Sequence, residues 1–243
     1  MTDAVCYRDA YARSIETVVG AVAVGPDGPL VTLERTVFYP GGGGQPSDRG
    51  ELRDTAGGRW VVLSARREGP DIVHQLVAGA TPPAVGRAVT ADLDWERRYR
   101  LMRTHTALHA LCGVVWRDHG ALVTGGNMEP GVGRMDFEFE TMSGELVATI
   151  EAAVNAELAA GREVRVRVLP RAEAFAIPDL IRTKVNLLPE GIEEVRTIEI
   201  VGLDLQADGG THVANTREVG RLRVTGYESK GRINKRIRIA LED

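Results

Sequence analysis

The sequence predicts a small all-β region followed by a larger α+β domain, with a boundary near residue 90. The first 80 or so residues contain short β-branched runs separated by Gly- and Pro-rich turns, without a long helical pattern. Beyond the boundary, two amphipathic helical patterns stand among further strands, without the regular strand–helix alternation of a parallel sheet. A chain of 243 residues is long enough for two modest domains with real cores.

Residues 1–90 are expected to form a small barrel or sandwich, because several short strands follow one another there. Turn sequences such as GPDGP, PGGGGQP and EGP separate the strands. We expect the strands at residues 14–24, 30–39, 50–54, 59–67, 71–77 and 86–94.

Residues 91–243 are expected to form the α+β domain. A helix should run from Asp94, which can cap it, to Asp118, and Gly120 should end it. Its core face would carry Leu101, Leu108, Leu111 and Val115. A second helix should begin after Ser143 and stop at Gly161. Further strands are expected at residues 135–140, 162–170, 197–205, 217–229 and 230–242.

The composition excludes several classes of protein. No apolar run approaches the roughly 18 to 20 residues that span a bilayer, so we expect no membrane segment. The N-terminus lacks an apolar signal core and the chain has two cysteines, which favours a cytoplasmic protein without a disulfide framework. A net charge of −4 argues against indiscriminate nucleic-acid coating, although a local basic patch can still bind RNA.

The segment His105-Thr-Ala-Leu-His109 is the strongest local signal for chemistry. Residues four apart on a helix lie over one another on one face, so two imidazoles can share a metal ion. Two unconnected polar residues would explain the pattern equally well. A protease of the H-E-x-x-H type is disfavoured, because Thr106 stands where its general base would be.

A second cluster, Asp208-Gly-Gly-Thr-His212, follows an apolar segment. Paired glycines allow a sharp turn that could bring Asp208 and His212 together, although an ordinary turn between strands has the same sequence. Three of the five histidines lie in these two clusters, which favours one shared metal site.

Four consecutive glycines, Gly41–Gly44, lie in the segment FYPGGGGQP (38–46). Such a loop is either a flexible linker or a surface where backbone N–H groups approach a ligand. The prolines and aromatic residues at its edges favour a held loop.

In this order, FYPGGGGQPSDRG (38–50), HTALH, GRMDF (133–137) and DGGTHVANTREVG (208–220) resemble the AlaX family, free-standing relatives of the editing domain of alanyl-tRNA synthetase. The resemblance covers nearly the whole chain. It implies the longer AlaX form, in which a small β-barrel precedes an α+β editing domain like that shared by threonyl- and alanyl-tRNA synthetases.

The resemblance also implies a zinc site and a reaction. The family holds Zn²⁺ with two histidines of H-x-x-x-H and a C-x-x-x-H pair, which correspond here to His105, His109, Asp208 and His212. Asp208 departs from the family's cysteine. The implied activity is hydrolysis of alanine tRNA mischarged with serine or glycine, with a metal-bound water as the expected nucleophile.

Seven further residues are candidates to contact substrate. Thr124 is expected to contact the serine hydroxyl or to be an ordinary turn residue, and Arg134 either lines the pocket or pairs with Asp136. The full candidate set is Gly41, Gly42, Gly43, Gln45, Thr124, Arg134 and Gln206.

Two basic stretches could bind tRNA. Residues 217–238 contain eight basic residues against two acids. As a strand, KGRINKRIRIA (230–240) would place Arg232, Arg236 and Arg238 on one face and isoleucines on the other. WERRYRLMR (95–103) offers a second cluster. Ordinary solvated surfaces explain both stretches too. Two alternative functions stay open: an RNA-binding module that has lost hydrolysis, because Asp208 replaces the family's cysteine, and a metallohydrolase of small esters that uses the same site without RNA.

Overall fold

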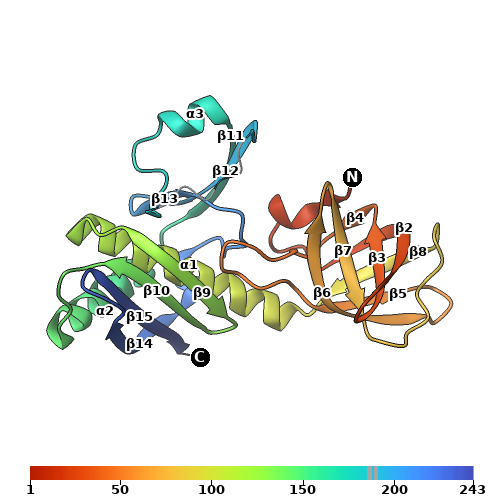
Figure 1. Cartoon of the computed structure of the whole chain (residues 1–243), viewed down its shortest axis with the longest axis horizontal. Coiled ribbons are helices and arrows are strands. Elements are labelled where there is room, and N and C mark those ends of the chain that lie inside the picture. The colour runs from red at the N-terminus through yellow and green to blue at the C-terminus, as the bar shows by residue number, and fades with distance from the viewer. Residues whose placement is uncertain (185–187, 189–190, 243) are drawn as a thin grey trace. The chain divides into compact units, whose positions relative to one another are not determined.

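The computed structural model describes residues 1–184, 188 and 191–242 and divides into two compact units, Met1–Arg100 and Leu101–Asp243 (Figure 1). The expected fold class, a β-barrel followed by an α+β domain, is confirmed. Among the described residues, no helix combines the length and the apolar character that crossing a membrane requires.

The first unit is built around a closed barrel with the strand order β2-β3-β7-β6-β5-β8. The strands are β2 (Ser14–Gly25), β3 (Gly28–Leu33), β5 (Gly50–Arg53), β6 (Arg59–Glu68), β7 (Asp71–Leu76) and β8 (Ala88–Leu93). Apolar side chains from these strands fill the interior, including Val19, Val31, Leu33, Leu52, Val62, Ile72 and Leu76. The predicted strand at 30–39 ends early at Leu33, and the two-residue strand β4 (Arg35–Thr36) pairs in parallel with β1 (Asp3–Ala4) beside the short 3₁₀ helix η1 (Val5–Tyr7).

Helix α1 (Trp95–His119) begins in the first unit and continues into the second. Asp94 caps it as predicted, because its Oδ1 accepts the backbone N–H of Arg97 at 3.1 Å. The boundary between the units falls at Arg100, later than residue 90, because β8 completes the barrel and the side chain of Arg98 is buried in the first unit.

The second unit contains a four-stranded antiparallel sheet of order β14-β15-β10-β9, covered by helices on one face (Figure 1). Its strands are β9 (Val123–Glu129), β10 (Val132–Glu138), β14 (Arg221–Ser229) and β15 (Asn234–Glu242). A Cβ on Gly133 of β10 would contact Leu108 of α1, so glycine allows the helix to pack closely there. Helix α2 (Gly144–Ala159) is capped by Ser143 as predicted and packs against β14. β9 was missed because its paired glycines indicate a turn.

A three-stranded sheet of order β11-β12-β13 completes the second unit. The strands are β11 (Val164–Pro170), β12 (Glu194–Ile200) and β13 (Asp204–Ala207). The single strand predicted at 197–205 is wrong, because Gly202 adopts a φ of 75° and turns the chain between β12 and β13. The short helix α3 (Arg171–Ala176) packs against one face, and the 3₁₀ helix η2 (Thr216–Val219) precedes β14.

One face of this three-stranded sheet carries the polar residues of β13. The β12–β13 register places Ile198 opposite Gln206 and Ile200 opposite Asp204. These residues share a face, and Asp208 follows Gln206 in the same alternation just beyond the strand. The chain therefore places Asp204, Gln206 and Asp208 on one side of the sheet. Helix α1, which carries the metal candidates His105 and His109, lies beside this sheet (Figure 1).

Candidate metal centre

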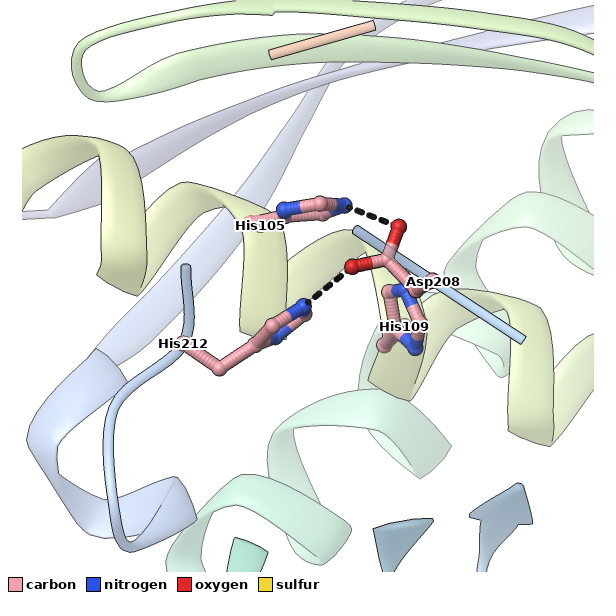
Figure 2. Close-up of side chains that lie close together, drawn as sticks. All are labelled: His105, His109, Asp208 and His212. Atoms are coloured by element: carbon pink, nitrogen blue, oxygen red, sulfur yellow. Dashed lines mark hydrogen bonds and ion pairs between the residues drawn. The ribbon is translucent and has the colours of Figure 1, made fainter. Parts of the chain in front are cut away.

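Four side chains from two distant parts of the chain converge at one point of the second unit (Figure 2). His105 and His109 come from α1, while Asp208 and His212 follow β13. One nitrogen or oxygen atom from each lies within 4.8 Å of the others. The His105 and His212 rings stack with their centroids 4.2 Å apart, and both lie close to the ring of His109. The structure thus brings together all four residues that the sequence singled out as metal ligands.

The local structure explains this convergence. His105 and His109 are one helical turn apart on α1, and both side chains are buried. Asp208 follows β13, where its backbone N–H donates to the carbonyl oxygen of Arg196 at 3.1 Å. Its Oδ2 accepts the Gly210 N–H at 2.6 Å, which tightens the turn toward His212. Asp208 is therefore held by the strand on one side and by its own turn on the other.

The carboxylate of Asp208 lies between two imidazoles. Its Oδ1 is 3.5 Å from Nε2 of His105, and its Oδ2 is 3.2 Å from Nε2 of His212 (Figure 2). The other nitrogen of His212, Nδ1, lies 3.1 Å from Oγ1 of Thr106. The same hydroxyl oxygen accepts the Val213 N–H at 3.3 Å. Thr106 therefore fixes the ring of His212 with its Nε2 toward the cluster.

Burial and charge suit these four residues to a divalent cation. The side chains of the three histidines are at most 7% exposed. Burial lowers the pKa of His105 to about 4 and that of His212 well below its usual value, so both rings are neutral at pH 7. Burial alone would raise the pKa of Asp208, but the surrounding imidazoles hold it well below the ordinary value. Neutral imidazoles and an ionised carboxylate are the donors that zinc takes.

His109 behaves differently from the other two histidines. Burial opposes its protonation, yet the carboxylates of Asp204 and Asp208 outweigh burial and raise its pKa. Asp204 Oδ2 lies 3.3 Å from His109 Nδ1. The two carboxylates therefore favour positive charge at this point of the cluster, which a bound cation would supply.

Comparisons with known proteins match both units. The model of the threonyl and alanyl tRNA synthetase second additional domain matches residues 195–238, and that of the class II (A) tRNA synthetases matches residues 12–97. The chain is 35% identical to an alanyl-tRNA editing protein AlaX-M of Methanosarcina mazei over 248 residues, covering 100% of this chain and 98% of that relative. This chain belongs to the AlaX family.

Further relatives agree with this assignment. An AlaX-M protein of Saccharolobus solfataricus is 37% identical over 238 residues, covering 98% of both chains. An alanine–tRNA ligase of Pyrobaculum aerophilum is 36% identical over 229 residues, covering 91% of this chain and 25% of the ligase. The whole chain therefore matches a free-standing AlaX-M protein, and 91% of it matches one quarter of a synthetase.

The candidate substrate residues of the second unit lie on its strands. Thr124 is exposed on β9, and its hydroxyl donates to Oδ1 of Asn234 at 2.9 Å. Arg134 on β10 pairs with Asp136 at 3.2 Å. Gln206 on β13 donates its amide to Oδ2 of Asp204 at 2.6 Å. Their roles toward substrate stay predictions.

The glycine-rich loop of the first unit is held in one conformation. Gly41, Gly42, Gly43 and Gly44 all have positive φ values, which strongly favour glycine. Gly42 and Gln45 exchange two backbone hydrogen bonds of 3.0 Å, and the Tyr39 hydroxyl donates to the carbonyl oxygen of Gly42 at 3.1 Å. Gln45 itself is buried. The loop is therefore an ordered turn. Its contact with the substrate stays a prediction.

The two basic stretches differ from their predicted form. β15 begins at Asn234, so Arg232 precedes the strand, and Lys235 is buried with its Nζ on two backbone carbonyls. Arg236 pairs with Asp136 at 2.7 Å. In the second stretch, residues 95–103, Arg98 is fully buried, so not all of its basic side chains are exposed to solvent. Six basic residues of the first stretch are exposed, namely Arg217, Arg221, Arg223, Lys230, Arg232 and Arg238.

Reasoning from the sequence missed three residues that surround the cluster. Thr106 was considered only as a departure from a protease motif, although it contacts His212. Asp204 and Arg196 were not singled out at all. An acid within the apolar segment TIEIVGLDL was the one available signal for Asp204, since burial of a lone carboxylate requires partners.

Proposed function

We propose that this chain hydrolyses the ester of alanine tRNA mischarged with serine or glycine, at a zinc site formed by His105, His109, Asp208 and His212. One observation carries the proposal: a member of the AlaX family buries three imidazoles and a carboxylate at a single point. The names of its relatives describe alanyl-tRNA editing, and we extend that activity to this chain.

The reaction needs little catalytic assistance from the protein, because an aminoacyl ester is already activated toward hydrolysis. A bound zinc ion would supply a Lewis acid that lowers the pKa of water and polarises a carbonyl group. The neutral rings of His105 and His212 offer nitrogen lone pairs, and Asp208 offsets the positive charge. Arg196 donates from Nη1 to the backbone oxygen of Asp208 at 3.0 Å, which holds that residue at the cluster.

Editing in trans also has an energetic reason. A synthetase pocket for alanine cannot strongly exclude the smaller glycine, and an apolar pocket rejects an added hydroxyl by only about 100-fold. A second site that hydrolyses the wrong ester removes the error. In our proposal Thr124 contacts the serine hydroxyl, while Arg134 and Gln206 line the same pocket.

The exposed basic residues between Arg217 and Arg238 are proposed to contact tRNA phosphates. Cations on a folded surface bind the phosphate backbone regardless of the overall charge of the chain. The net charge of −4 makes a local surface necessary for this contact. Deacylation should therefore weaken as salt concentration rises.

One comparison of substrates tests this proposal. The protein should release serine from alanine tRNA much faster than alanine, and it should leave a small seryl ester without RNA almost untouched. Equal rates on seryl and alanyl tRNA would contradict editing. Fast cleavage of the small ester would favour a metallohydrolase, and tight tRNA binding without any hydrolysis would favour a binding module.

The glycine loop has its own test within this proposal. We expect Gly41, Gly42, Gly43 and Gln45 to approach the end of the substrate. Gly43 has a φ of 58°, a value that asparagine tolerates and valine does not. Gly43→Asn should therefore keep the melting temperature and reduce deacylation. Undiminished deacylation by this variant would show that the loop does not meet the substrate.

A further inference from the structure

The carboxylate of Asp204 is buried beside the cluster but outside the proposed ligand set. Asp204 is 4% exposed at the start of β13. Its Oδ2 lies 3.3 Å from Nδ1 of His109. Asp204 therefore touches the ring of a proposed ligand without being one of the four converging residues.

Several contacts fix Asp204 in this place. Gln206 donates its amide to Oδ2 at 2.6 Å, and Nε of Arg182 lies 3.6 Å from Oδ1. Helix α1 comes close enough that a Cβ on Gly113 would lie 2.9 Å from the Cβ of Asp204. Glycine at position 113 therefore makes room for the carboxylate one helical turn beyond His109.

The contacts of Asp204 are incomplete in the part of the chain that the structure describes. There, His109 Nδ1, Asp204 Oδ1 and Arg182 Nε are all buried without a well-directed hydrogen bond. Burying a carboxylate with incomplete hydrogen bonding costs free energy, and a folded protein that accepts this cost commonly does so at a functional site. Asp204 lies between the other two groups, with His109 at one carboxylate oxygen and Arg182 at the other, so its incomplete contacts adjoin a proposed metal ligand.

We propose that Asp204 is a positioning residue that accepts the Nδ1–H of His109 and so turns the Nε2 lone pair of this ring toward the metal. The inference rests on the proposed function, because it takes His109 as a ligand. A carboxylate behind a histidine ligand fixes the tautomer and the ring orientation and makes the nitrogen more basic. Thr106 has the corresponding place behind His212, but its hydroxyl carries no charge.

The test measures zinc affinity by competition with a chelator. Asp204→Asn keeps the shape of the side chain and removes its charge, so zinc should bind about 10- to 100-fold more weakly than to the unaltered protein. Asp136→Asn is the matched control, because Asp136 is also buried in this unit but pairs with Arg236 and Arg134 instead of a histidine. The control should keep its zinc affinity within about twofold of the unaltered protein even where its melting temperature falls.

A second measurement avoids substitution altogether. In the zinc-loaded protein, ¹⁵N spectra of the histidine rings should show His109 protonated at Nδ1. Protonation of His109 at Nε2, or equal zinc affinity of Asp204→Asn and the unaltered protein, would overturn the role of Asp204 and leave the proposed function intact. If the unaltered protein binds no zinc, both the proposed function and this inference fail.

Discussion

The buried histidines of the two units differ in what their ring nitrogens contact. In the barrel, His74 is fully buried with Nε2 2.8 Å from Thr36 Oγ1 and Nδ1 3.0 Å from the carbonyl oxygen of Val31. Both of its nitrogens are satisfied by groups of the fold. In the second unit, His105, His109 and His212 instead meet one another and Asp208.

The buried carboxylates of Asp48 and Asp204 show the same contrast. Asp48 in the first unit is enclosed by Arg98, which contacts both carboxylate oxygens, and by the backbone N–H of Tyr39 at 2.6 Å. Arg98 also donates to two backbone carbonyls. Asp204 in the second unit keeps one buried oxygen without a hydrogen bond among the described residues. Buried polar groups whose hydrogen bonds are all made stabilise the fold. Buried polar groups that converge and leave hydrogen-bonding atoms without a partner are typical of a binding site.

The largest expected effect comes from removing one imidazole of the cluster. His105→Ala should lose nearly all its zinc and its deacylation activity, because a shared site needs every ring. His74→Gln should keep both, since the two ring nitrogens of His74 bond to Thr36 and Val31 of the first unit. Metal analysis of the dialysed proteins measures this difference. Full zinc occupancy in His105→Ala would show that the cluster is not a shared site.

The next largest effect concerns the stability of the first unit. Arg98→Met leaves Asp48 as a buried charge without its cation, which should reduce the free energy of unfolding by about 3–5 kcal/mol. Urea titration measures the loss. The double variant Arg98→Met with Asp48→Leu, which removes both charges, should recover part of the lost free energy of unfolding. A single variant as stable as the unaltered protein would contradict the structural role of this pair.

The pH dependence of stability should show that His74 is buried in its neutral form. Burial lowers the pKa of His74 from 6.5 to about 4 in the folded chain. As pH falls below about 6.5 the unfolded chain gains a proton before the folded one does, so stability is lost between pH 6.5 and 4, by about 3 kcal/mol at most. Denaturant midpoints over this range should fall less for His74→Gln. Parallel curves would contradict the buried, neutral state of His74.

The smallest expected effect is at Asp208. A thiolate is a softer ligand than a carboxylate and suits zinc well, so Asp208→Cys should tighten zinc binding. Asp208→Ala should weaken binding less than loss of any histidine. Chelator titration of the three proteins orders their affinities. Equal release by Asp208→Cys and the unaltered protein would mean that residue 208 does not face the metal.

The sequence predicted best those features that depend on neighbours in the chain. The cap at Asp94 follows from the capping preference of aspartate, and the pairing of His105 with His109 follows from helical spacing. The β-barrel followed from its short strands and turns together with the family resemblance. The position of Thr106 behind His212 did not, because that contact joins segments distant in the sequence.

Features that depend on turns or on distant partners were harder to predict. Gly125 and Gly126 lie within β9, where sheet pairing overrides their preference for turns. Gly202 does the reverse and breaks an apolar segment that reads as one strand. Asp204 could not be connected with His109 before the β12–β13 register was known.

Removal and return of the metal tests the central claim most directly. Protein stripped of zinc by a chelator should lose hydrolysis of seryl alanine tRNA and keep its fold by circular dichroism. Adding zinc back should restore the rate in proportion to occupancy, up to about one ion per chain. Full hydrolysis by the stripped protein would contradict a metal-dependent site at His105, His109, Asp208 and His212.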